Sequence, residues 1–158
     1  DRILIVPHEL STSHIKQLES EAPESTCTIN QTSPHPEAKI IIVNEMGILA
    51  YLYRMANCVY VGGGFGDGIH SILEAAVYGV PVIFGPKHHK FKEAADLIRL
   101  GAAKSVQNSS DLLNAVIHFD QTPIRVEVKA ILDHYFQDQS GASERVSHYI
   151  EHRLKEMT

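Results

Sequence analysis

Two kinds of apolar segment alternate between residues 3 and 106 of the chain. Segments of the first kind are short runs rich in Ile and Val, with apolar residues at successive positions, which is typical of strands covered on both faces. Segments of the second kind have apolar residues three or four positions apart, which predicts helices. Strands are predicted over residues 3–6, 27–30, 39–43, 58–61, 82–84 and 103–106, and helices over residues 13–21, 46–56, 69–78, 91–100 and 110–119.

This alternation predicts an α/β fold, namely a Rossmann-like, doubly wound parallel sheet of about six strands with helices on both faces. Beyond the last predicted strand the alternation stops. Two extra C-terminal helices are predicted over residues 126–137 and 142–155, with a break at Thr122-Pro123. The segment 31–37, which contains Pro34-His35-Pro36, is predicted to form a turn.

The length and charge of the chain limit the classes of function. With 158 residues it can bury one core of its own. The net charge of -5 gives no electrostatic reason to expect a nucleic-acid partner. Cys27 and Cys58 lie in apolar runs without metal-ligand spacing, so we expect core residues in a reducing compartment. Because Asp1 leads directly into the first predicted strand, we expect residues 1–158 to be a single domain of a longer protein.

A glycine-rich loop, residues 62–68, follows the fourth predicted strand. Five of its seven residues are glycine: Gly62, Gly63, Gly64, Gly66 and Gly68. Glycine permits positive φ angles and lets a ligand approach the backbone. The N-terminus of the helix predicted after the loop would favour an anion. The alternative is a tight strand-to-helix turn that needs glycine only for packing.

The spacing around this loop excludes several kinds of nucleotide site. The chain contains no Gly-x-Gly-x-x-Gly motif, no Walker phosphate loop and no Asp-x-Asp motif for a metal-bound diphosphate. An anion would therefore be held without metal by backbone N–H groups, the helix dipole and His70. Glu74, one turn further along, either accepts hydrogen bonds from ribose hydroxyls or is an ordinary solvated glutamate.

These motifs resemble those of the Kdo (3-deoxy-manno-octulosonate) transferases. That family has a Val-Gly-Gly strand end, then Gly-Gly-His-Asn-x-Leu-Glu, then Phe-Gly-x-Pro-Val-x-Phe-Gly-Pro. The corresponding segments here are 60–64, 68–76 and 78–86, followed by Phe91-Lys92-Glu93. Upstream, Met46-Gly47 and Pro7-His8-Glu9 are also similar to family segments, so the resemblance covers most of residues 3–106.

Three features depart from the family pattern. Ser71 stands where the family has Asn, Ile48 stands where it has Glu, and the glycine loop is shorter. Ser71 can still donate a hydrogen bond, whereas Ile48 cannot replace a carboxylate. The resemblance therefore leaves any polar role of that family Glu without a counterpart in this chain.

The resemblance implies a GT-B glycosyltransferase, in which this chain would be the C-terminal half that binds the donor CMP-Kdo without a metal cofactor. The acceptor would be a lipid A precursor at the cytoplasmic face of the bacterial inner membrane. Acceptor and membrane contacts, and the general base, would belong to a missing N-terminal domain. The chain alone is then expected to bind nucleotide weakly and to catalyse nothing. The final helix, 140–156, would either cross onto that missing domain or pack in the core.

The resemblance also implies roles for individual residues. Glu74 would bind the ribose, and Met46 and Gly47 would border the cytosine. His8 would either donate to the phosphate or pack in a turn, and the loop Pro86-Lys87-His88 would either face the donor or be solvated. The phosphate and the sugar carboxylate would be bound by Gly62, Gly63, Gly64, Phe65, Gly66, Gly68, His70 and Ser71.

Two other functions fit part of the pattern. One is another GT-B transferase or an epimerase that uses a UDP-sugar, since such enzymes share the glycine loop and the helical Glu. The other is a non-enzymatic α/β binding module. That module would not need a polyglycine loop at the start of a helix, so the motifs favour the transferases.

Overall fold

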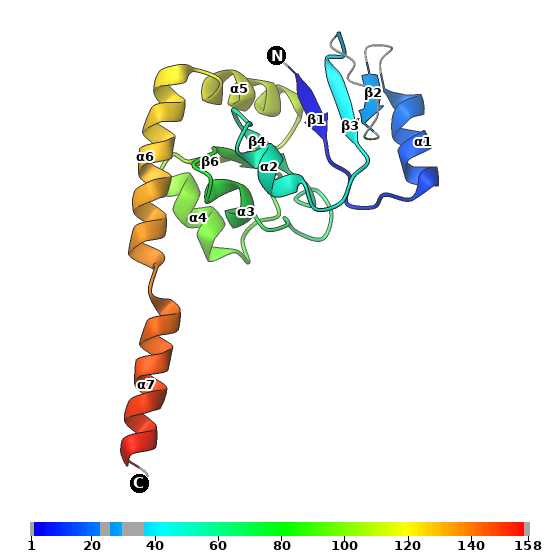
Figure 1. Cartoon of the computed structure of the whole chain (residues 1–158). Helices are drawn as coiled ribbons and strands as arrows, with labels where there is room; N and C mark the ends of the chain where they lie inside the picture. Colours follow the sequence, from blue (N-terminus) through cyan, green and yellow to red (C-terminus); the bar gives the residue numbers. More distant parts are fainter. Residues whose placement is uncertain (1, 23–25, 30–36, 157–158) are drawn as a thin grey trace. The chain divides into compact units, whose positions relative to one another are not determined.

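The computed structural model describes residues 2–22, 26–29 and 37–156. The chain divides into two compact units, Asp1–Leu52 and Tyr53–Thr158, and each is described by itself. Figure 1 labels the helices and strands of both units.

The first unit is built on a parallel three-stranded sheet. Its strands β1 (Ile3–Ile5), β2 (Thr26–Ile29) and β3 (Ile40–Val43) lie in the order β1-β3-β2. Helix α1 (Thr12–Glu21) connects β1 to β2, and the Ser11 side chain caps it by accepting a hydrogen bond from the His14 amide. After β3, Ile48 and Leu52 pack against a small apolar cluster of Ala38, Ile41 and Val43.

The second unit contains the other parallel sheet. Its strands β4 (Val59–Val61), β5 (Val82–Phe84) and β6 (Ala103–Ser105) lie in chain order, with β5 in the centre. Every residue of β5 is fully buried, because the strand has a neighbour on each edge and apolar side chains on each face. As all three strands are parallel, the loops that follow β4 and β5 leave from the same edge of the sheet.

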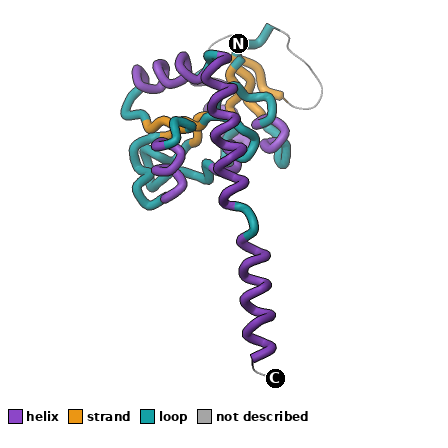
Figure 2. The backbone as a smooth tube through the Cα atoms, turned by 90° about the vertical axis from the view of Figure 1, so that its left-hand side faces the viewer, coloured by secondary structure: helices purple, strands orange, loops and turns teal. Residues whose placement is uncertain are grey.

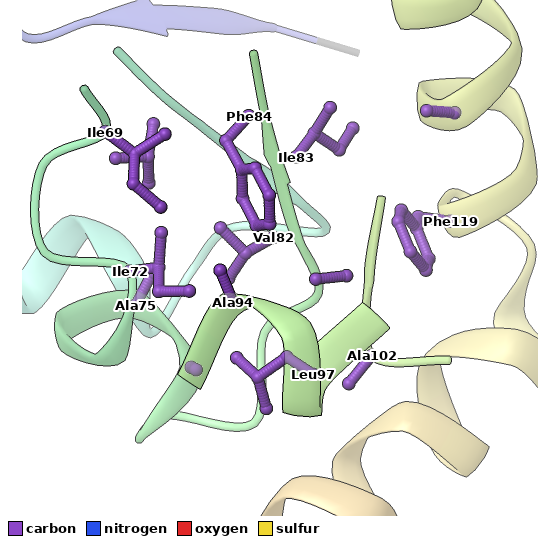
Figure 3. Close-up of a cluster of buried hydrophobic side chains, with 14 of the residues drawn as sticks. Ile69, Ile72, Ala75, Val82, Ile83, Phe84, Ala94, Leu97, Ala102 and Phe119 are labelled. Atoms are coloured by element: carbon purple, nitrogen blue, oxygen red, sulfur yellow. The ribbon is translucent and has the colours of Figure 1, made fainter. Parts of the chain in front are cut away.

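The core of the second unit covers both faces of β5 (Figure 3). Val82 and Phe84 point to the side of Ile72 and Ala94, whereas Ile83 points to the opposite side, as strand alternation requires. The helices around this sheet are α3 (Leu73–Ala76), α4 (Lys92–Arg99), α5 (Ser109–Phe119) and α6 (Thr122–Gln139).

The last helix, α7 (Ala142–Glu156), is separated from α6 by a short loop (Figure 2). Gly141 in that loop has a φ of +80°, a conformation that L side chains rarely adopt. Ser140 forms the C-cap of α6. None of the helices that the structure describes is long and apolar enough to cross a membrane.

The strand predictions are confirmed, but the predicted sheet is wrong. In the described part of the chain six strands lie at the predicted places, and they pair as two three-stranded parallel sheets, whereas one sheet of about six strands was predicted. The turn predicted at 31–37 falls on residues 31–36, which lie outside the described part of the chain, and Glu37 is in a turn.

Three helix predictions are wrong in extent. Helices α2 (Leu49–Tyr53) and α3 are shorter than predicted, and α6 begins before the predicted start. Gly47 precedes α2 and Gly79 follows α3, each with a positive φ that departs from helical geometry. The predicted break at Thr122-Pro123 is the first turn of α6, where proline is tolerated because its missing N–H needs no partner.

Candidate functional site

The glycine loop closes on itself at the end of β4. The amides of Gly66 and Gly68 donate to the Gly63 carbonyl at 2.8 and 3.3 Å, and the His70 amide donates to the Gly62 carbonyl at 3.2 Å. Gly63 has a φ of +87°, and a Cβ there would lie 2.2 Å from the Gly68 oxygen. Gly63 is therefore required by the turn itself, as the packing interpretation of this loop expects.

Gly64 is required by a second loop. A Cβ on Gly64 would lie 2.6 Å from the Gly85 nitrogen, and a Cβ on Gly85 would lie 2.7 Å from the Gly64 carbonyl carbon. The Lys87 amide also donates to the Gly64 carbonyl at 2.9 Å. The loops after β4 and β5 therefore pack backbone to backbone, which only glycine permits at this contact.

Two glycines of the loop are not explained by the fold. The nearest atoms to a Cβ would be 3.9 Å away at Gly62 and 3.5 Å away at Gly66, both ordinary contact distances, and neither residue has a positive φ. A side chain would fit at both positions. The absence of one leaves the backbone open to close approach by a ligand, so Gly62 and Gly66 support the ligand-binding interpretation.

The expected placement of His70 and Ser71 in the first turn of a helix is wrong. Helix α3 begins at Leu73, so both residues lie in the irregular segment between the loop and the helix, where both are exposed. The hydrogen bond from the His70 amide to Gly62 ties this segment to the loop. Because α3 has four residues, its dipole is small, and an anion here would depend on backbone N–H groups and side chains.

Glu74 lies on the exposed side of α3, whereas Ala75 and Ala76 are fully buried. Within the described residues no group donates a hydrogen bond to its carboxylate, so the oxygens can accept bonds from a ligand. Burial raises the pKa of Tyr53, and the nearby charge of Glu74 raises it further. The Tyr53 phenol therefore lies close to Glu74 and stays protonated.

The loop after β5 contacts the glycine loop through Lys87. Its Nζ donates to the Gly66 carbonyl at 2.6 Å.

The His88 ring lies edge-on to Phe84, with centroids 5.2 Å apart, and its Nδ1 is buried with no partner among the described residues. Burial lowers the pKa of His88, and the neighbouring His89 lowers it further, which favours a neutral ring. Pro86, which precedes Lys87 in this loop, is half-buried.

The remaining predicted ligand residues lie in the first unit. His8 follows β1 and is exposed, and Met46 and Gly47 follow β3, where Met46 is 79% exposed. Since β1 and β3 are parallel neighbours, all three residues lie at the carboxyl edge of that sheet. The structure thus groups the predicted residues into two sets, one at the carboxyl edge of each sheet.

Ile48 explains one departure from the family pattern. Its side chain packs against the apolar cluster of Ala38, Ile41 and Val43. The position that carries a carboxylate in the family is therefore used here for packing.

Two features of the site depend on the folded chain. Tyr53 lies in the helix predicted over residues 46–56, and the nearness of its phenol to the charge of Glu74 depends on tertiary packing. The side chain of Lys87 was expected to face the donor or solvent, and it instead binds the Gly66 carbonyl. No group of three or more His, Cys, Asp or Glu residues that could hold a metal occurs among residues 2–22, 26–29 and 37–156.

Comparison with solved structures establishes the class of fold. The crystal structure of the C-terminal CMP-Kdo binding domain of WaaA from Acinetobacter baumannii matches with a TM-score of 0.75, covering 86% of this chain and 74% of that chain. The two sequences are 20% identical. The chain therefore shares the α/β fold of that domain, and the predicted α/β class is confirmed.

Sequence comparison then confirms the resemblance to Kdo transferases. The chain is 34% identical over 98 residues to the 3-deoxy-D-manno-octulosonic acid transferase of Aquifex aeolicus, which covers 60% of this chain and 28% of the relative. It is 29% identical over 131 residues to the enzyme of the same name from Rickettsia felis, which covers 81% of this chain and 28% of the relative. The match with the Bordetella pertussis enzyme is 32% identical over 94 residues and covers 58% of this chain and 22% of the relative.

No protein-family model matches the chain. In these three alignments the chain spans 28%, 28% and 22% of its relatives' own length. The similarity thus covers only one part of these longer enzymes.

Proposed function

We propose that this chain is the donor-binding half of a glycosyltransferase and binds CMP-Kdo through the glycine loop and Glu74. The observation that carries the proposal is the pair Gly62 and Gly66, which the fold does not require to be glycine, in the same loop-to-helix segment as an exposed carboxylate. The similarity to Kdo transferases and to a CMP-Kdo binding domain supports this ligand class.

The roles in the proposed site follow from its chemistry. The backbone at Gly62, which is half-buried, and at Gly66, which is exposed, would bind the phosphate and the sugar carboxylate together with His70 and Ser71. Glu74 would accept hydrogen bonds from the ribose hydroxyls. Phe65 is half exposed within the loop and would cover one side of the donor.

The proposed reaction transfers the Kdo group from CMP to an acceptor hydroxyl. The bond between the anomeric carbon and the phosphate oxygen breaks, so negative charge develops on the departing CMP. This chain would stabilise that charge with hydrogen-bond donors and without a metal ion. A general base must remove the acceptor's proton, and we place it in the part of the enzyme that this chain does not include.

The full enzyme would act on a lipid A precursor at the cytoplasmic face of the inner membrane, with membrane contact outside this chain. Four apolar side chains of α7, at helical spacing, are each at least 50% exposed: Val146, Tyr149, Ile150 and Leu154. We assign this stripe to contact with the N-terminal domain. Without that domain the chain would bind donor weakly and transfer nothing.

Nucleotide selectivity tests the proposed donor. In calorimetric titrations of the 158-residue chain we expect CMP to bind at least about tenfold more tightly than UMP, the difference that one well-made specific hydrogen bond provides. Cytosine and uracil differ only in the exocyclic group on C4 and in the hydrogen on N3, so the pair is matched in size and charge. Tighter binding of UMP would contradict a CMP-sugar donor and favour a transferase or epimerase that uses a UDP-sugar.

A further inference from the structure

Two hydrogen bonds from one residue join the loop after β5 to the glycine loop. The Lys87 amide donates to the Gly64 carbonyl at 2.9 Å, and the Lys87 Nζ donates to the Gly66 carbonyl at 2.6 Å. The first bond adds to the backbone contact between Gly64 and Gly85. The second bond reaches further into the loop, past the point where the two backbones touch.

The hydrogen bond from the Lys87 side chain helps to fix Gly66, whose position is not determined by packing. Gly66 is exposed, and a Cβ there would meet nothing closer than 3.5 Å, so van der Waals contacts do not fix it. Its position depends on its own amide bond to Gly63 and on the ammonium of Lys87. A hydrogen bond from a charged donor is stronger than one between neutral groups.

The ammonium of Lys87 is not part of an ion pair with the described acidic residues, since the salt bridges of this structure involve other cations. Its positive charge is therefore only partly balanced by the carbonyl dipole. The charge lies beside Gly66, one of the two glycines at which a ligand can approach the backbone. An anionic group that enters the loop would meet this charge.

We propose that Lys87 is a positioning residue that tethers the glycine loop at Gly66 and so holds it ready for an anionic ligand. The ligand class, a nucleotide phosphate, rests on the proposed function, whereas the tether is a property of the ligand-free chain. Lys87 acts through the loop: its bonds to Gly64 and Gly66 fix the backbone that the phosphate meets.

Lys90 provides a matched control. It lies in the same loop and is exposed, and no described contact joins it to the glycine loop. Lys87→Met and Lys90→Met remove the same charge and keep a side chain of similar length. Lys87→Arg keeps both the charge and a donor, so it should restore the tether.

Amide hydrogen exchange of the ligand-free 158-residue chain measures the tether directly. We expect the amides of Gly66, Gly68 and His70 to exchange about tenfold faster in Lys87→Met, as loss of one charged hydrogen bond implies. Exchange in β5 should not change, and Lys87→Arg and Lys90→Met should behave as the unsubstituted chain. Lys87→Met should also weaken CMP binding about tenfold, and Lys90→Met should not.

Several outcomes would overturn the proposal. The tether is absent if the loop amides of Lys87→Met exchange at the original rate. Equal acceleration in β5 would mean general destabilisation and not local positioning. Faster loop exchange with unchanged CMP affinity would show that the tether does not prepare the site. If the unsubstituted chain binds no CMP, the proposed donor fails, and the exchange data alone still support or overturn the tether.

Discussion

Substitution of Glu74 by Gln is expected to weaken CMP binding at least about tenfold and to leave the stability of the chain unchanged. The binding loss follows from the chemistry of the carboxylate, whose two oxygens can each accept a hydrogen bond from a ribose hydroxyl. Hydrogen bonds to charged groups contribute roughly 1.5–3 kcal/mol each, and about 1.4 kcal/mol corresponds to a factor of ten. Stability should not change because Glu74 is exposed and lies outside the core.

Two comparisons make this test specific. Glu127→Gln removes the same charge from an exposed position on α6 and should leave CMP affinity unchanged. The 2′-deoxy form of CMP should bind less tightly than CMP to the unsubstituted chain, and this difference should disappear in Glu74→Gln. If Glu74→Gln weakens the binding of CMP and of 2′-deoxy-CMP by the same factor, the difference in affinity between the two nucleotides is preserved. That result would show that Glu74 does not bind the ribose.

Gly64→Ala is expected to destabilise the second unit by about 1–3 kcal/mol or more. The new Cβ would lie 2.6 Å from the nitrogen and 2.7 Å from the Cα of Gly85. These are backbone atoms of a buried residue directly after the central strand β5, so they cannot move aside as a flexible side chain could. Urea unfolding followed by circular dichroism measures the change.

Gly66→Ala is the matched control for Gly64→Ala. Its Cβ would meet nothing closer than 3.5 Å, so the free energy of unfolding should stay within about 0.5 kcal/mol. CMP binding should nevertheless weaken, because the methyl group occupies space that the proposed ligand needs. Equal stability of the two variants would contradict the assignment of Gly64 to packing between the two loops.

The strands could be predicted from sequence because their cause is local. Residues Ile40–Val43 and Val82–Phe84 are apolar at successive positions, and both runs are strands with mostly buried side chains. Helix lengths could not be predicted as well. Helix α2 begins only after Gly47, which has a positive φ, and α3 begins only at Leu73, beyond the irregular segment that the His70 amide ties to Gly62.

The location of the candidate site was predictable, but which of its residues serve packing and which leave room for a ligand was not. The run of glycines identified the loop, and parallel topology placed it at the carboxyl edge of a strand. Which glycines serve packing depends on Gly85, a residue of another loop. The contact of Lys87 with Gly66 likewise exists only in the folded chain.

A residue-resolved NMR titration of the 158-residue chain with CMP shows whether the glycine loop and Glu74 bind the donor nucleotide. We expect the largest chemical-shift changes on the amides of residues 62–74, from the glycine loop to Glu74, and we expect Glu74→Gln to reduce them. Changes centred elsewhere, such as on α5 or α6, would contradict the assignment of the donor site to this loop.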